Sequence, residues 1–147
     1  MYYCDTSFVT PLVLPESASD ALIAFLKKGR PRELAVSLWT NVEFASMVSR
    51  RLRMGELTER QAELARDAFQ GMVARSYRVL LPSAADYDLA AKFLENYKTG
   101  LRAGDALHLA IAKNHGARMV YSLDAGLVKA ATVFKISVST GMREQNR

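Results

Sequence analysis

Short apolar runs alternate along this chain with longer segments of helical periodicity, and this alternation is the feature that most limits its possible folds. The apolar runs predict five strands, at residues 1–4, 33–39, 77–81, 118–121 and 134–138. Between them, apolar side chains recur three and four residues apart, which is typical of helices that cover a core. Strands that alternate with helices predict a parallel α/β sheet with right-handed crossovers.

The helical segments differ in what they are expected to contact. Helices are predicted at 16–28, 40–54, 83–97 and 106–112, with another that begins at the capping-box pattern of Thr58 and Gln61 and a short one after Asp124. The second helix and the capping-box helix are predicted to form an antiparallel hairpin beside the sheet. The helix at 106–112 is apolar nearly all round, which predicts that it is buried.

The length and the cysteine count limit the class of protein. The 147 residues suit one domain, expected to span 1–147 with a polar tail from about residue 140. The single cysteine, Cys4, excludes an internal disulfide and favours a reducing compartment. The sequence shows neither a signal peptide nor an apolar run near the roughly 20 residues of a membrane-spanning helix. We therefore expect a soluble, cytoplasmic protein.

The net charge of +5 is distributed unevenly. Between Glu95 and Glu144 the acids are Asp105 and Asp124, whereas the same stretch contains Lys98, Arg102, Lys113, Arg118, Lys129, Lys135 and Arg143. Basic surface around isolated acids suits a polyanionic substrate whose reacting group meets a metal ion. For the charge alone, a solvated surface that keeps the protein in solution is the simpler explanation.

Four acids occupy corresponding places in the predicted order of elements. Asp5 and Asp124 each follow a strand, Glu43 lies in the first turn of the helix after the second strand, and Asp105 begins the buried helix. The carboxyl ends of parallel strands and the amino ends of the following helices share one edge of a sheet, which is where such sheets bind ligands. The sequence therefore predicts that the four carboxylates converge on one crevice.

Each acid also has a purely structural interpretation. Asp5 is suited to cap the turn that follows it, Glu43 to complete a capping box with Thr40, and Asp105 and Asp124 to serve as N-caps. Residue by residue the two interpretations stay open. Coincidence is a weaker explanation for all four acids reaching the same edge.

Convergent carboxylates repel one another, so a cation is expected between them. Ligand sets made only of oxygen atoms select Mg²⁺ or Mn²⁺, and Mg²⁺ is typically shared between one or two carboxylates, waters and substrate phosphates. Such an ion orients a phosphate and activates water. These acids therefore indicate phosphodiester hydrolysis.

The local sequences around these acids resemble the PIN-domain ribonuclease family, especially the VapC-like toxins of bacterial toxin–antitoxin pairs. The matching segments occur in family order and cover nearly the whole chain: Tyr3-Cys4-Asp5-Thr6-Ser7, Asn41-Val42-Glu43-Phe44-Ala45, Asp105-Ala106-Leu107-His108-Leu109-Ala110 and Ser122-Leu123-Asp124. The resemblance implies a three-layer α/β/α fold with a mostly parallel sheet of four to five strands and a protruding helical hairpin.

The resemblance also implies the chemistry. Asp5, Glu43, Asp105 and Asp124 would hold Mg²⁺ or Mn²⁺ and activate water to cut RNA, and Ser7 matches the hydroxyl that supports the first acid. Ser122 stands where many relatives carry Thr, and an alanine rather than an acid follows Asp124, which puts a second metal site in doubt. The implied partners are an RNA substrate, a small antitoxin and a second copy of the chain.

Other side chains near these motifs have weaker assignments. Arg102 is a candidate for phosphate contact, although an ordinary surface arginine is nearly as good an interpretation. His108 lies one helical turn after Asp105, where packing is the simpler explanation and a ligand or proton-shuttle role the alternative. The arginines at 50, 51 and 53 are explained by favourable interaction with the helix dipole.

Other functions compete with that of a toxin nuclease. A PIN-domain nuclease of RNA processing would need no antitoxin, and a pseudo-nuclease would bind RNA or protein without cutting. The intact acids argue against the pseudo-nuclease. A haloacid-dehalogenase-like phosphatase needs a second Asp two residues after Asp5, where the chain has Ser7, so that function is rejected.

Overall fold

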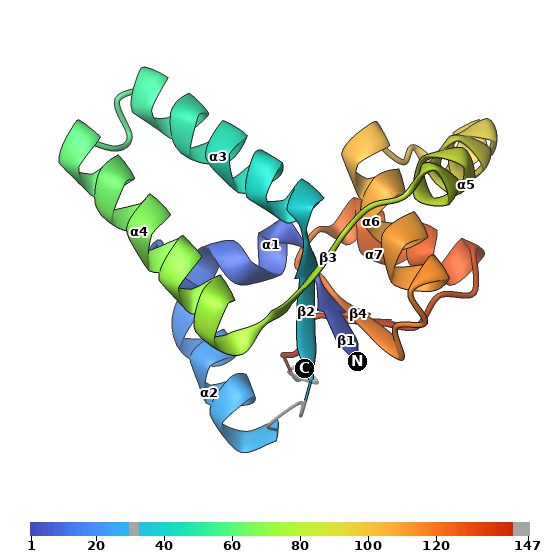
Figure 1. Cartoon of the computed structure of the whole chain (residues 1–147), viewed down its shortest axis with the longest axis horizontal. Coiled ribbons are helices and arrows are strands. Elements are labelled where there is room, and N and C mark those ends of the chain that lie inside the picture. The colour runs from blue at the N-terminus through green and yellow to red at the C-terminus, as the bar shows by residue number, and fades with distance from the viewer. Residues whose placement is uncertain (30–32, 143–147) are drawn as a thin grey trace, which may run out of the picture.

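The computed structural model describes residues 1–29 and 33–142 and has three layers (Figure 1). Its middle layer is a five-stranded sheet in the order β3-β2-β1-β4-β5, in which every neighbouring pair of strands is parallel. The strands are β1 (Tyr2–Cys4), β2 (Leu34–Ser37), β3 (Arg78–Leu80), β4 (Met119–Tyr121) and β5 (Val138–Ser139). The predicted α/β fold with a parallel sheet is confirmed.

Helices cover both faces of this sheet (Figure 1). One side carries α1 (Thr6–Val9), the 3-10 turn η1 (Thr10–Leu12), α2 (Ser19–Gly29), α3 (Leu38–Arg53) and α4 (Glu59–Ser76). The other side carries α5 (Ala84–Glu95), the 3-10 turn η2 (Tyr97–Thr99), α6 (Ala103–Asn114) and α7 (Ala125–Val133). As predicted, α3 and α4 form a protruding hairpin. In the described part of the chain, no helix is both long and apolar enough to cross a membrane.

The central strand β1 is buried on both faces. Its Tyr3 side chain belongs to the core beneath α5, α6 and α7, and its Cys4 side chain to the core beneath α1, α3 and α4. Residues on neighbouring positions of a strand point to opposite faces, so one strand serves both cores. Tyr2 pairs with Leu34 of β2 and with Met119 of β4. The carboxyl ends of these three strands consequently meet at one edge.

The predicted extent of two strands was wrong. The run at 33–39 was predicted as strand throughout, but β2 ends at Ser37 and α3 begins at Leu38. The Ser37 backbone N–H donates to Thr40 Oγ1 (3.2 Å), and the helix starts two residues earlier than predicted. Of the run at 134–138, only Val138 belongs to β5, because the residues before it complete the turn that ends α7, where Lys135 has φ +56° and Ile136 N–H donates to Ala131 O.

The remaining boundary differences are small. The helix predicted from residue 16 begins at Ser19, whose hydroxyl accepts from Glu16 N–H and donates to Pro11 O. Tyr97, the last residue of the helix predicted at 83–97, lies instead in η2 and is 81% exposed. Of the predicted polar tail at 140–147, residues 143–147 lie outside the described part of the chain.

Candidate functional site

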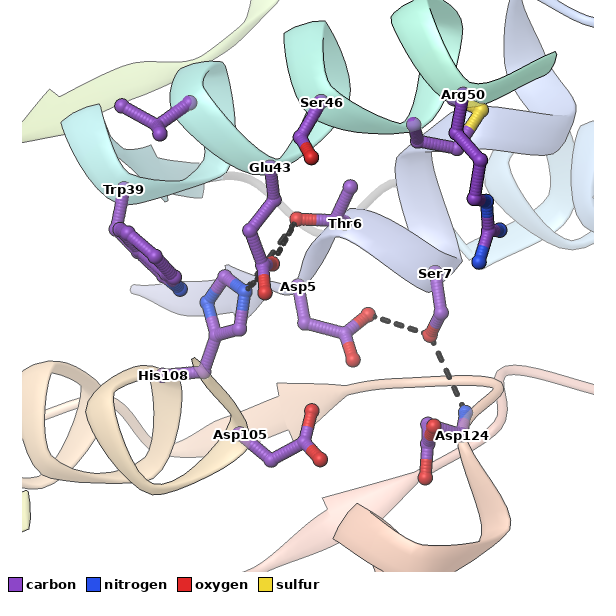
Figure 2. Close-up of a pocket in the computed structure, with 12 residues that line it drawn as sticks. Asp5, Thr6, Ser7, Trp39, Glu43, Ser46, Arg50, Asp105, His108 and Asp124 are labelled. Atoms are coloured by element: carbon purple, nitrogen blue, oxygen red, sulfur yellow. Dashed lines mark hydrogen bonds and ion pairs between the residues drawn. The ribbon is translucent and has the colours of Figure 1, made fainter. Parts of the chain in front are cut away.

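An open pocket of about 430 Å³ lies at the carboxyl edge of the sheet (Figure 2). It lies below α3 and above the first turns of α6 and α7 in that view. The four acids that the sequence brings to one edge, Asp5, Glu43, Asp105 and Asp124, all line it. They come from four separate elements, so the pocket depends on the assembled fold.

Asp5 directly follows β1 and is both an N-cap and a wall of the pocket. Its Oδ1 accepts from the Phe8 backbone N–H (2.9 Å) and from Ser7 Oγ (2.7 Å), and its Oδ2 accepts from Ser122 Oγ (2.6 Å). The side chain is almost fully buried. Burial raises the pKa of Asp5, while His108 and these donors oppose the rise.

The predicted supporting hydroxyls join the ends of β1 and β4. Ser7 Oγ donates to Asp5 and accepts from the backbone N–H groups of Leu123 (2.8 Å) and Asp124 (3.2 Å). Ser122 Oγ donates to Asp5 and accepts from Asp124 N–H (3.0 Å). Asp124 caps α7 through Oδ1, which accepts from the Leu127 N–H (2.9 Å). Capping and pocket formation are thus combined in Asp124 as in Asp5.

Glu43 lies in the second turn of α3, not in its first turn, and the capping box predicted for it with Thr40 does not form because Ser37 is the N-cap. Its Oε2 accepts instead from Thr6 Oγ1 and His108 Nε2, each at 2.5 Å. Burial favours a higher pKa for Glu43, but the hydrogen bond and charge of His108, with Thr6, hold the pKa below its usual range. Glu43 therefore stays ionised at neutral pH.

His108 connects the pocket to the core of the protein. It is 1% exposed, and its Nδ1 lies 2.7 Å from Tyr3 OH, which in turn lies 2.8 Å from Ser37 Oγ. The packed histidine predicted from the sequence is therefore present, and it also binds Glu43. Its position one turn after Asp105 was the signal for this contact, but the partner on α3 is 65 residues away in sequence.

Asp105 has a strongly raised pKa. Asp105 was predicted to be the N-cap of α6. It is instead the third residue of that helix, and Arg102 is the N-cap. Within the described residues its carboxylate makes no hydrogen bond. Burial, and then the negative charge of Asp124, raise its pKa to about 6. A cation beside this carboxylate would favour its ionised form.

Gly104 allows α6 to approach α3 at the pocket. A Cβ atom on Gly104 would lie 2.5 Å from Glu43 Oε1 and 3.4 Å from Trp39 Cζ2. Trp39, predicted to end a strand, lies in the first turn of α3 and lines the pocket. No signal in the sequence indicates the role of Gly104, because the contact joins two helices that are far apart in the chain.

The basic residues of the pocket differ from the prediction. Arg102, the candidate for phosphate contact, is exposed at the N-cap of α6 and does not line the pocket. Arg50, assigned from sequence to the helix dipole, does line it. Arg50 lies seven residues after Glu43, two helical turns along the same face of α3, and this spacing was the signal that it faces the acids.

The donor atoms at this pocket are suited to a hard divalent cation. The acids supply carboxylate oxygens, and the raised pKa of Asp105 reflects its burial first and then the negative charge of Asp124. As the side chains stand, no group of three His, Cys, Asp or Glu residues in 1–29 and 33–142 is arranged to hold a metal ion.

The sequence matches the PIN domain family over residues 2–133. No curated protein matches it at a significant level. FitAcB from Neisseria gonorrhoeae has a similar fold, with a TM-score of 0.69, 19% identity and coverage of 96% of this chain and 98% of that chain.

Two further solved structures share this fold. VapC20 from Mycobacterium tuberculosis, described as a sarcin-ricin loop cleaving toxin, has a TM-score of 0.68 and 18% identity over 88% of this chain and 95% of that chain. VapBC2 from Rickettsia felis, bound to a DNA fragment from their promoter, has a TM-score of 0.68 and 13% identity over 94% and 96%. At these identities the likeness shows the fold alone.

Proposed function

The chain belongs to the PIN domain family, and from this membership and the geometry of its acids we propose that it is an Mg²⁺- or Mn²⁺-dependent endoribonuclease. The observation that carries the proposal is the convergence of Asp5, Glu43, Asp105 and Asp124 on one pocket. We propose that residues 1–147 form a single nuclease domain that acts in the cytoplasm.

The four acids are proposed as the metal-binding and catalytic residues. When bound among them, Mg²⁺ or Mn²⁺ neutralises the carboxylates, orients the phosphate and stabilises the charge that develops on it. Ser7 and Ser122 hold Asp5 in one orientation. Glu43, kept ionised by His108 and Thr6, is able to accept a hydrogen bond from water and orient it.

The proposed biological role is that of the toxin of a toxin–antitoxin pair. VapC20, which shares the fold, is described as a toxin that cleaves the sarcin-ricin loop. The chain is proposed to cut RNA, to be silenced by a small antitoxin protein and to form a homodimer. Growth arrest on expression, relieved by co-expression of a small protein encoded next to the gene, is the expected result for a toxin.

The cleavage test uses the purified chain with a labelled RNA in Mg²⁺ or Mn²⁺, against the same reaction in chelator. We expect cleavage only with the metal ion, and loss of cleavage in Asp124→Asn. Metal-independent cleavage that survives Asp124→Asn would indicate a contaminating nuclease. RNA binding without cleavage under every condition would favour the pseudo-nuclease, and cleavage without growth arrest would favour an RNA-processing enzyme.

A further inference from the structure

Helix α3 presents one continuous face to the pocket. Trp39, Val42, Glu43, Ser46, Met47 and Arg50 recur three and four residues apart and all line it. Figure 2 shows this face above Asp5, Asp105 and Asp124, with Glu43 and Arg50 reaching down from different turns. The face extends well beyond the acids, so it offers contacts to more of a substrate than its reacting group.

The three arginines at the end of α3 have different environments. Arg51 is ion-paired with Glu16, and Arg53 Nη1 donates to Ser49 Oγ (2.8 Å). The Arg50 side chain makes no hydrogen bond or ion pair within the described residues, and it extends into the pocket toward the side of Ser7 and Asp124 (Figure 2). The helix dipole acts on all three arginines alike and does not explain why only Arg50 enters the pocket.

Arg50 is the one arginine or lysine among the described residues that line this acidic pocket, yet it forms no ion pair with the acids. Guanidinium groups bind phosphate through two parallel hydrogen bonds, and an arginine without protein partners has these donors available. A polyanion with one phosphate at the acids would bring another phosphate within the same groove. Because the Arg50 guanidinium lies apart from the carboxylates of the pocket, the groove suits a nucleic-acid strand, in which successive phosphates are linked.

The groove also continues away from the acids. A second pocket of about 270 Å³ shares Thr6, Ser7 and Met47 with the first one and extends to the Glu16–Arg51 pair. A substrate longer than a single nucleotide thus has room along α3 outside the acid pocket.

We propose that Arg50 binds a backbone phosphate next to the scissile one and so fixes the path of single-stranded RNA along α3. This inference rests on the proposed ribonuclease function and adds a substrate-binding residue to it. Its effect is on the affinity for RNA, because Arg50 lies apart from the acids.

The experiment compares Arg50→Ala with Arg53→Ala, which removes the same charge from the same helical turn outside the pocket. The dissociation constant of a labelled single-stranded RNA is measured in chelator over a range of salt concentrations, and KM and kcat are measured with Mn²⁺. We expect Arg50→Ala to weaken affinity and raise KM about tenfold, as for one lost charged hydrogen-bonding contact. The salt slope should become shallower by about 0.7.

Arg53→Ala should leave affinity, KM and salt slope close to wild type, and Arg50→Lys should restore part of the salt slope. Thermal melting of each variant confirms that it is folded. Equal affinity, KM and salt slope in Arg50→Ala and Arg53→Ala would overturn the proposal. If the wild type binds RNA without cutting it, the proposed enzymatic function fails, while the binding series still decides on Arg50. A wild type that neither binds nor cuts RNA overturns both.

Discussion

Asp105 provides a quantitative test, because its carboxylate is held in the pocket without a hydrogen-bonding partner among the described residues. Its pKa rises from 3.8 to about 6. At about 1.36 kcal/mol per unit, this corresponds to roughly 3 kcal/mol of destabilisation by the ionised group. The side chain is only about half-buried, so solvent screening reduces the penalty to roughly 1–2 kcal/mol.

Asp105→Asn should therefore stabilise the metal-free protein. The third position of a helix favours negative charge by about 0.3–1 kcal/mol, which the variant loses, so we expect a net gain of about 1 kcal/mol. At this chain length the melting temperature should rise by roughly 2–4 °C. Asp and Asn have similar helix propensity, so the helix itself should be unaffected.

The gain should depend on pH in a defined direction. The folded protein holds the Asp105 proton more tightly than the unfolded chain, because the folded pKa is about 6 and the unfolded value is 3.8. The penalty is thus fully present above pH 6 and disappears as the pH falls toward about 4. Asp105→Asn should melt above wild type at pH 7.5 and at the same temperature as wild type near pH 4.

The measurement is thermal melting in chelator, followed by titration with Mg²⁺ or Mn²⁺. Asp67→Asn, the same chemical change on the exposed face of α4, is the matched control and should have little effect. Added metal should stabilise wild type more than Asp105→Asn, because a ligand of the native state stabilises it by mass action. A variant that melts well below wild type in chelator at pH 7.5 would show that Asp105 is a structural acid.

Three further substitutions test the surroundings of the acids. Glu43→Gln should keep the circular dichroism spectrum and lose cleavage by roughly 10²–10⁴-fold, as expected when an ionised acid–base group is removed; near-normal cleavage would exclude Glu43 from the chemistry. Gly104→Ala should displace the flexible Glu43 carboxylate from a 2.5 Å contact, so cleavage should fall while the melting temperature changes little. Ser122→Ala removes a donor from buried Asp5 and should cost about 1–3 kcal/mol in urea denaturation, and no loss of stability would contradict this account.

The sequence was sufficient for the order of elements and for the edge at which the acids meet. Both depend on local periodicity and on the rule that parallel strands share one carboxyl edge. At residues 37–43 this periodicity was misleading, because helix capping inside the apolar run ends β2 and starts α3. Ser37 and Thr40 cap α3 inside an apolar run, which a strand prediction based on apolar character does not reveal.

The partners of the acids were not predictable in the same way. Glu43 is separated in sequence from Thr6 by 37 residues and from His108 by 65 residues. Its contacts with them depend on how closely α3 and α6 approach. That approach depends on the missing side chain of Gly104. Arg50 was assigned to the helix dipole from its charge and its place at the end of α3, although its spacing of seven residues from Glu43 indicates that it lies on the face of the acids.

The strand order determines when the pocket forms during synthesis of the chain. β1 is made first but lies between β2 and β4, and its Asp5 receives a hydrogen bond from Ser122, 117 residues later. A nascent chain that has reached α5 already carries Asp5 and Glu43, but the other two acids and one neighbour of β1 do not yet exist. The pocket is completed only after β4 and the start of α7 leave the ribosome. Any activity of this site therefore begins only near the end of synthesis, when β4 pairs with its neighbouring strands.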